Sequence, residues 1–315
     1  MNNYALFTDI HGNYTAFEAV MQDMGECEEM RTEGHLHRVC LGDSYDGGPD
    51  PAAVFDALER MNCPQLCGNH EDYLFDCRKH PTEERFLRPL WKFVPWTVAR
   101  LGPRLERIEK SLHQRWTSSG APLSAVHASV NNNKRVPDFF AQQSSLSSVF
   151  TENYLEDTSH GEQLIFNGHS HYLGRHKDPS GRTVWFNCGS VGYPFVDKLP
   201  EVPDAPLATW VLVEVLKENR IRMTNRRVPY SSDLLLRRYV DSGALEECAP
   251  FSYAIAAQSL FNQDVVYPFF QSVKNRNFTP HEMSQCLVEE MRRQNVFERI
   301  NRLLRRAGLK EVHKE

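Results

Sequence analysis

The chain has 315 residues, enough for one large domain or two modest ones. Apolar residues make up 41% and charged residues 24%, an ordinary globular composition that excludes disorder and low complexity. The formal charge of −5 argues against a protein that binds nucleic acid polymers. No apolar run approaches the ~20 residues needed to span a bilayer, so we expect no membrane contact.

The eight cysteines are scattered, and none has the C-x-x-C spacing of a zinc ribbon. The first residues contain neither the charged nor the apolar segment of a signal peptide. We therefore expect a cytoplasmic protein whose thiols are reduced and mostly buried.

In the first part of the chain, short β-branched or aromatic runs alternate with helical patterns. Helices are predicted at Tyr14–Met24 and Asp50–Met61, the second with Asp50 as N-cap and Pro51 at its first position. This alternation predicts an α/β fold. Strands are predicted at Tyr4–Thr8, Leu36–Leu41, Gln65–Cys67 and Leu123–Val126.

A helical stretch at Glu83–Trp116 interrupts this alternation, and three prolines divide it into two or three helices. We treat residues 80–118 as an insertion. The later strands follow one another with little helix between them, so the sheets should be mixed. They are predicted at Gln163–Phe166, Thr183–Phe186 and Ala208–Leu216, with a Pro-rich and acidic loop at residues 196–206.

From Leu234 onward the strand signal stops, which predicts a main domain at residues 1–233 and a helical extension at 234–315. Thr279 and Glu282 form a predicted capping box, and Gly308 is a natural helix stop. Basic residues from Arg292 to Lys310 are assigned to one helix. We expect them to form a solvated face, and contact with a partner is the alternative.

Side chains able to bind metal follow five consecutive predicted strands. Because the ends of such strands meet at one edge of an α/β sheet, these side chains should converge. Each short motif is weak alone, but all five in order are hard to obtain by chance. The seven residues are Asp9, His11, Asp43, Asn69, His127, His169 and His171.

Seven donors are more than one ion needs, so they indicate two ions that share a carboxylate. Mixed oxygen and nitrogen donors suit manganese, iron, zinc or nickel better than calcium. The alternative is a structural zinc site around His169 and His171, although such sites more often use cysteine.

The motifs D-x-H, G-D-x-x-D, G-N-H-E and G-H-S-H, with a histidine after the fourth strand, resemble the calcineurin-like metallophosphoesterase superfamily. Residues 187–194 resemble a strand-turn of its small prokaryotic phosphodiesterase-like branch, with Cys188 in place of a proline. The resemblance covers residues 4 to 245. It implies an α/β/β/α fold, in which two mixed β-sheets pack as a sandwich flanked by helices.

The resemblance also implies roles for these residues. Asp9, His11 and His171 would hold the first ion, Asn69, His127 and His169 the second, and Asp43 would bridge them. His70 would be a proton donor or phosphate contact, with Asp46 as its carboxylate partner. The implied reaction is in-line attack by a metal-bridging hydroxide on a phosphodiester or phosphomonoester, with His70 as the general acid.

The expected partner is a small phosphorylated substrate, and nucleic acid enters only as a nucleotide. Protein phosphatases of the superfamily have an arginine where this chain has Gly47, which argues against a protein Ser/Thr phosphatase. A dinucleoside polyphosphate hydrolase is another alternative. An inactive scaffold should have lost site residues, and all of them are present here.

Two further segments could contact a substrate. The insertion should border the cleft, and its Trp91, Phe93 and Trp96, with Trp116, are expected to pack against the main domain; a wall for an aromatic group is the alternative. Lys134 or Arg135 could neutralise substrate charge in place of the missing arginine. The alternative is that these residues belong to an exposed polar loop without such a role.

Overall fold

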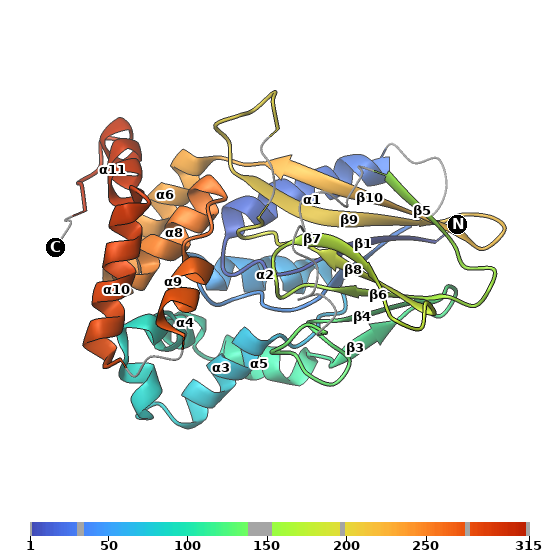
Figure 1. Ribbon diagram of the computed structural model, residues 1–315, viewed down its shortest axis with the longest axis horizontal. Coiled ribbons are helices and arrows are strands. Elements are labelled where there is room, and N and C mark those ends of the chain that lie inside the picture. The colour runs from blue at the N-terminus through green and yellow to red at the C-terminus, as the bar shows by residue number, and fades with distance from the viewer. Residues whose placement is uncertain (1, 30–34, 138–152, 196–198, 275–277, 313–315) are drawn as a thin grey trace.

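The computed structural model describes residues 2–29, 35–137, 153–195, 199–274 and 278–312. Within these residues, two five-stranded sheets pack face to face (Figure 1). The first sheet has the order β2 (Leu36–Cys40), β1 (Asn3–Phe7), β9 (Leu207–Val215), β10 (Arg220–Pro229), β5 (Asn153–Asp157). The second has the order β3 (Arg115–Thr117), β4 (Leu123–Val126), β6 (Gln163–Asn167), β8 (Thr183–Cys188), β7 (Leu173–Lys177).

Both sheets are mixed. In the first, β1 pairs with β2 in parallel and with β9 in antiparallel orientation. In the second, β4, β6 and β8 are parallel, and β3 and β7 run antiparallel at the two edges. The predicted α/β architecture, two mixed sheets in a sandwich with flanking helices, is therefore confirmed.

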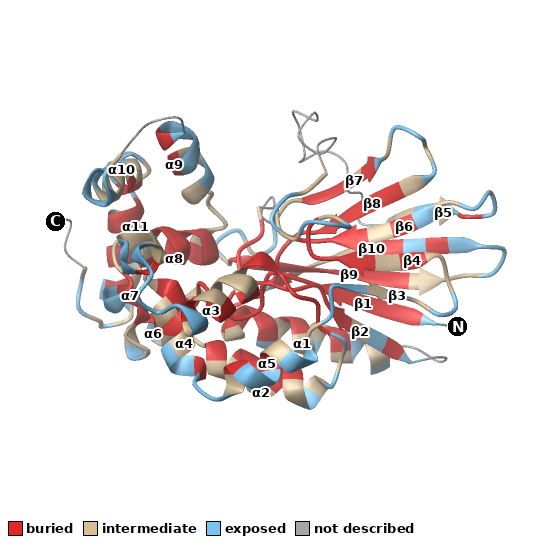
Figure 2. Ribbon diagram, turned by 90° about the horizontal axis from the view of Figure 1, so that it is seen from below, coloured by how far each residue is buried: buried red, intermediate tan, exposed pale blue. Residues whose placement is uncertain are grey.

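Strand β1 lies at the centre of the core and is buried on both faces. Because successive side chains of a strand point to opposite faces, Tyr4 and Leu6 pack between the two sheets, where they meet residues such as Phe166. Ala5 and Phe7 point the other way, into the helices. This double burial explains why β1 reads as a continuous apolar run. Figure 2 shows the central strands as buried.

Helices pack on the first sheet and around one end of the sandwich (Figures 1 and 2). The insertion consists of two short 3-10 turns and two α-helices, and Trp116 lies in strand β3 rather than in a helix. The helices of the first half are α1 (Tyr14–Glu29), α2 (Pro51–Met61), α3 (Asn69–Lys79), η1 (Glu84–Leu87), η2 (Pro89–Trp91), α4 (Phe93–Leu101) and α5 (Arg104–Ser111).

The C-terminal helices share one apolar cluster with β1 and α1, since Tyr239, Met291 and Leu304 belong to the same cluster as Phe7 and Phe17. The division at residue 233 remains a prediction. None of the helices in the described part of the chain is long and apolar enough to cross a membrane. These helices are α6 (Ser232–Asp241), α7 (Ala244–Glu247), α8 (Phe251–Phe261), α9 (Val266–Val273), α10 (Pro280–Arg293) and α11 (Val296–Arg306).

The capping box of Thr279 is present, because its hydroxyl accepts from the Glu282 amide and the Glu282 carboxylate accepts from the Thr279 amide. The prediction of one helix through the basic residues is wrong, because the helix is interrupted at Asn295. Asn295 has a left-handed backbone with φ of 56°, so α11 starts in a new direction.

One other local prediction is wrong, and a second, Asp50 as the N-cap residue with Pro51 at the first helical position, is confirmed in position only. Gln65–Cys67 makes only single bridges, to Cys40 and to His113, and is not a strand. Asp50 does precede α2, but its side chain makes no capping hydrogen bond and lies 3.4 Å from Arg238 instead. The tertiary ion pair has replaced the local cap.

If the C-terminal helices share the core, removing a buried side chain from them should destabilise the whole protein. Leu304 is fully buried, and Leu304→Ala should lower the free energy of unfolding by about 2–5 kcal/mol. Leu234, which is 40% exposed, provides a matched control: Leu234→Ala should cost about 0.5 kcal/mol or less. Urea denaturation followed by circular dichroism measures both, and equal midpoints would contradict the shared core.

Candidate functional site

The sandwich brings all seven predicted metal-binding side chains together at one edge. Asp9 and His11 follow β1, Asp43 follows β2, and the three remaining loops follow β4, β6 and the bridge before α3. Because β1 with β2, and β4 with β6, run parallel, each pair delivers its loops to the same end. Within the described residues, three sets of donor atoms each lie within 4.8 Å of one another. Two sets contain predicted ligands only, and the third links them through His11 and Asp43 to His70.

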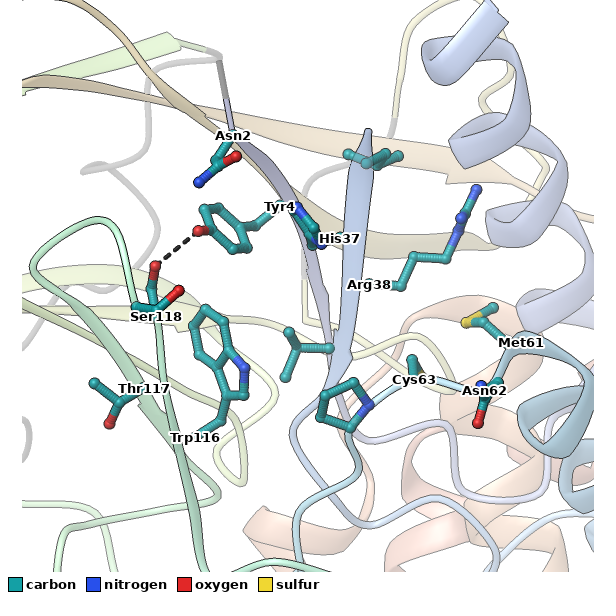
Figure 3. A pocket seen from close by; sticks show the side chains of 14 residues that line it. Asn2, Tyr4, His37, Arg38, Met61, Asn62, Cys63, Trp116, Thr117 and Ser118 are labelled. Carbon is teal, nitrogen blue, oxygen red and sulfur yellow. Dashed lines mark hydrogen bonds between the residues drawn. The ribbon is translucent and has the colours of Figure 1, made fainter. Parts of the chain in front are cut away.

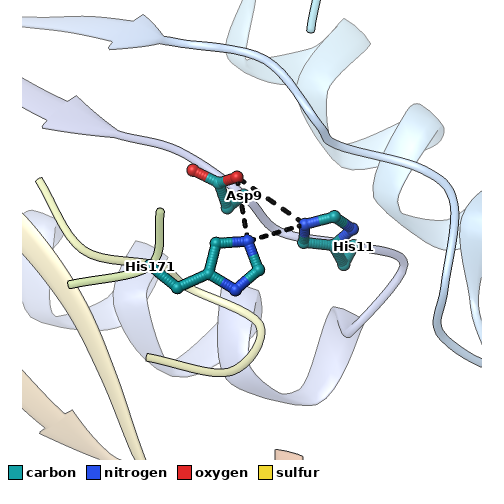
Figure 4. Close-up of side chains that lie close together, drawn as sticks. All are labelled: Asp9, His11 and His171. Atoms are coloured by element: carbon teal, nitrogen blue, oxygen red, sulfur yellow. Dashed lines mark hydrogen bonds and ion pairs between the residues drawn. The ribbon is translucent and has the colours of Figure 1, made fainter. Parts of the chain in front are cut away.

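The first group contains Asp9, His11 and His171 (Figure 4). Asp9 Oδ1 lies 3.2 Å from His171 Nε2 and 3.6 Å from His11 Nε2. The other carboxylate oxygen, Asp9 Oδ2, accepts from the Thr8 hydroxyl and from the His169 amide. Asp9 Oδ1 is buried and has no hydrogen-bond partner in the described part of the chain. One carboxylate oxygen is thus held in place while the other faces two imidazoles.

His11 is oriented by a backbone carbonyl. Its Nδ1 lies 2.8 Å from the oxygen of Asp46, so the ring proton sits on Nδ1 and donates there. The lone pair of Nε2 then points at Asp9 Oδ1 and at His171 Nε2, which is 3.2 Å away. Electron pairs that face one another in a buried site repel unless a cation lies between them, so these residues fit a metal ion.

The second group contains Asp43, His127 and His169, and Asn69 joins it. His127 Nδ1 donates to the Leu41 carbonyl oxygen at 2.9 Å, which turns Nε2 toward Asp43 Oδ2 at 3.2 Å. Asn69 Oδ1 lies 3.2 Å from His127 Nε2 and 2.7 Å from His169 Nδ1. The oxygen and nitrogen donors of this group therefore also face one centre.

Asp43 connects the two groups. Its Oδ2 lies 3.2 Å from His127 Nε2 and 3.9 Å from His11 Nε2. Its Oδ1 accepts from the backbone amide of His70 at 2.9 Å. This position fits the bridging role that the sequence predicts, and the role itself stays a prediction.

The electrostatics of the site follow from its two buried carboxylates. Burial alone would raise the pKa of Asp43, but His127 and His70 hold it below its usual range. Burial opposes protonation of His127, yet Asp43 outweighs it and raises the His127 pKa to about 10. Burial and the neighbouring His127 lower the pKa of His169 to about 4. Positive charge beside Asp43 therefore stabilises the site, and a metal ion can replace the proton that Asp43 stabilises on His127.

The backbone is strained where these side chains attach. Ten non-glycine residues of the described chain have positive φ, and five of them are predicted ligands: Asp9, His11, Asp43, His169 and His171. Such conformations are costly and persist only where the surrounding structure enforces them. At Gly68, a Cβ atom would lie 2.1 Å from Asp43 Oδ1, so only glycine allows α3 to start this close to the site.

His70 lies beside the two groups, with a carboxylate behind it. Its Nδ1 donates to Asp46 Oδ2 at 2.8 Å, and Asp46 Oδ1 accepts from the Thr97 hydroxyl at 3.0 Å. The His70 side chain is 29% exposed, whereas Asp46 is 3% exposed. Burial opposes protonation of His70, but Asp43 and Asp46 raise its pKa to about 9. The His70 imidazole is thus held in place by Asp46 and is partly exposed to solvent.

Glu71 holds the site together, a role that the sequence motifs alone do not reveal. Its fully buried carboxylate accepts from three backbone amides, those of Asp43, Ser44 and Gly68, at 2.7–2.9 Å. It therefore ties the loop after β2 to the start of α3. The available signal was its place as the third helical residue after Gly68, where a glutamate commonly caps a helix.

The aromatic residues of the insertion divide. Phe93 and Trp96 are buried in the core, as expected. Trp91 packs edge-on against Tyr73, whose ring contacts His70. Trp116 packs edge-on against Tyr4 and the core between the sheets, as expected. It also lines a pocket of about 570 Å³ between the edge strands β2 and β3, where Tyr4 bonds to Ser118 (Figure 3). None of the seven predicted ligands lines that pocket.

Known proteins share this fold. The family model described as calcineurin-like phosphoesterase matches residues 3–173. The crystal structure of a metallophosphoesterase from Sphaerobacter thermophilus is 19% identical, covers 80% of this chain and 98% of its own, and has a TM-score of 0.55. A hypothetical protein from Pyrococcus horikoshii OT3 is 17% identical, with 84% and 100% coverage and a TM-score of 0.57. No curated protein matches the sequence.

If Glu71 fixes the loops, a substitution that keeps its shape should weaken the whole site. In Glu71→Gln one acceptor oxygen becomes an amide group that faces backbone N–H groups, so the free energy of unfolding should fall by about 1–3 kcal/mol. Manganese bound at limiting concentration should also fall. Glu84→Gln, at an 81% exposed position, is the matched control and should behave like the parent. Parental stability and metal content in Glu71→Gln would contradict this role.

Proposed function

Because the chain belongs to the calcineurin-like phosphoesterase family, a family of hydrolytic phosphoesterases, we propose that it hydrolyses a small phosphodiester or phosphomonoester with two divalent metal ions. The observation that carries the proposal is the convergence of two donor groups on Asp43, beside the pair formed by His70 and Asp46.

In this proposal Asp9, His11 and His171 hold one ion, Asn69, His127 and His169 hold the other, and Asp43 is shared. When bound, two such ions activate a water molecule at neutral pH and bind the phosphate oxygens. The mixed oxygen and nitrogen donors support manganese, iron, zinc or nickel. Because the metal centre supplies the nucleophile, the chain needs no nucleophilic serine or cysteine.

His70 would act as the general acid. With Nδ1–H donating to Asp46, the proton on Nε2 is free to pass to the leaving oxygen as the P–O bond breaks. Asp46, held in turn by Thr97, keeps the ring oriented and stabilises its cationic form. General acid catalysis of this kind typically contributes ~10²–10⁴-fold. The partial exposure of His70 supports this role, since a substrate must reach it.

The structure around Gly47 supports a small ester over a phosphoprotein. The φ of Gly47 is 105°, and a Cβ atom there would lie 3.3 Å from the Tyr193 hydroxyl. An arginine at this position would therefore be strained. A dinucleoside polyphosphate hydrolase remains the second candidate, because it uses the same chemistry. An inactive scaffold is less well supported, because all seven donors and His70 are present.

The compartment and partners belong to the same proposal. The eight cysteines are unpaired, and all lie within the described residues, which supports a reducing compartment such as the cytoplasm. The net charge of −5 supports a small phosphorylated substrate rather than a nucleic acid polymer.

The direct test is hydrolysis by manganese-loaded protein of bis(p-nitrophenyl) phosphate and of p-nitrophenyl phosphate. We expect p-nitrophenolate release that EDTA abolishes and that added manganese restores. Faster cleavage of the diester would favour phosphodiesterase activity, and cleavage of the monoester alone would favour a phosphatase. Two bound ions without turnover of either ester would contradict the proposal.

The role of His70 is tested by changing the leaving group. His70→Ala should keep both ions, because His70 is not a proposed ligand. It should lose ~10²–10⁴-fold in kcat for an ester with an alkoxide leaving group, and less for p-nitrophenolate, which leaves without a proton. His281→Ala, at an exposed position on α10, is the control. Equal losses for both leaving groups would refute the general-acid role.

A further inference from the structure

The surface next to His70 carries an aromatic ring. Tyr73 lies one turn after Asn69 and His70 on α3, and its ring centroid is 5.3 Å from that of His70. Trp91 packs edge-on against Tyr73 at 5.0 Å, and Phe86 supports Trp91 at 5.8 Å. The insertion therefore holds Tyr73 from behind while the ring stays half-buried beside the site.

A lysine lies over this ring. The ammonium nitrogen of Lys134 is 5.6 Å from the Tyr73 ring centroid. The side chain of Asn133 donates to the Gly68 carbonyl oxygen at 3.2 Å and to Asp72 at 2.9 Å. These bonds fix the loop after β4 against the first turn of α3. The hydrogen bonds of Asn133 therefore hold the adjacent Lys134 next to Tyr73.

The charge of Lys134 is available. Its side chain is exposed, and among the described residues its ammonium group forms no ion pair with a carboxylate. Neighbouring cations are engaged: Arg85 pairs with Asp76 and Glu83, and Lys92 donates to the Ala249 carbonyl oxygen. An exposed ammonium group over an aromatic ring can therefore accept an anion without breaking an existing ion pair.

A half-buried carboxylate, that of Asp264, interacts with His171. Asp264 accepts from the Tyr172 hydroxyl at 3.4 Å and from the Tyr267 amide at 3.0 Å. No lysine or arginine of the described chain pairs with it, and its carboxylate interacts electrostatically with His171. A substrate with a second negative charge is therefore favoured on the His70 side and disfavoured on the His171 side.

We propose that Lys134 binds an anionic group on the leaving group of the substrate. The inference rests on the proposed function, because general acid catalysis by His70 identifies its side as that of the leaving oxygen. Tyr73 positions the lysine and lines the path of the leaving group. The preferred substrate is then an ester whose alcohol carries a further negative charge, and Lys134 supplies the cation that Gly47 cannot.

Two chromogenic diesters test this inference: methyl 4-nitrophenyl phosphate, and methyl 3-carboxy-4-nitrophenyl phosphate, whose leaving group is anionic. We expect the parent to prefer the carboxylated ester. Lys134→Gln should lower kcat/KM for that ester by about fivefold and change the other by less than twofold. Lys134→Arg should restore the preference. Lys177→Gln, with the same loss of charge at the exposed end of β7 away from His171, is the control and should leave both values unchanged.

Salt gives an independent readout. The parent's preference for the carboxylated ester should decline as sodium chloride is added, and that of Lys134→Gln should not. If Lys134→Gln lowered kcat/KM equally for both esters, or for neither, the inference would be overturned. The proposed function would still stand as long as the parent cleaved the uncarboxylated ester in a metal-dependent way. Failure of the metal-loaded parent to cleave either ester would overturn the proposed function and this inference with it.

Discussion

Two buried carboxylates, Asp9 and Asp43, set the constraint on which the site depends. In each, one carboxylate oxygen accepts hydrogen bonds from backbone amides or a hydroxyl, and the other oxygen faces imidazole nitrogens. A buried charge is costly unless it is paired. Protonated histidines can neutralise these carboxylates. Divalent ions can neutralise them better, because the imidazole lone pairs already point toward the centre of the site. The arrangement is one that a cation completes.

The rest of the fold serves to hold this arrangement against its own repulsion. The ligand loops take left-handed conformations, so other contacts must stabilise them. From one side, Glu71 binds three loop amides. From the other, the Ser190 hydroxyl and the Gly192 amide both donate to the Asp9 carbonyl oxygen, at 2.8 and 2.9 Å. The turn after β8 thereby fixes the loop after β1 and couples the two sheets at the site.

The site was predictable from sequence because its residues occupy fixed positions after strands. The two sheets were predictable because β1, β4 and β6 are apolar and bounded by turns. Four strands were missed. Three of them, β3, β5 and β7, are sheet edges, where half of the surface faces water and sequences such as Arg-Trp-Thr lose the apolar signal. The fourth, β10, lies inside the first sheet, but its four arginines interrupt the apolar pattern. Glu71 was missed as a support because two of its partners, the amides of Asp43 and Ser44, lie in a distant loop that only the fold brings to α3.

The proposed metal ligands and the residues proposed to contact the substrate lie in different segments of the chain. The proposed metal ligands come from loops at the common edge of the sandwich. Residues around them come from other parts of the chain: Trp91 from the insertion, Lys134 from the loop after β4, and Asp264 from the segment between α8 and α9. Those parts can vary without moving Asp43, because Glu71 and the backbone already fix it. Substrate choice can therefore change through side chains that contact the substrate, while the metal site stays as it is.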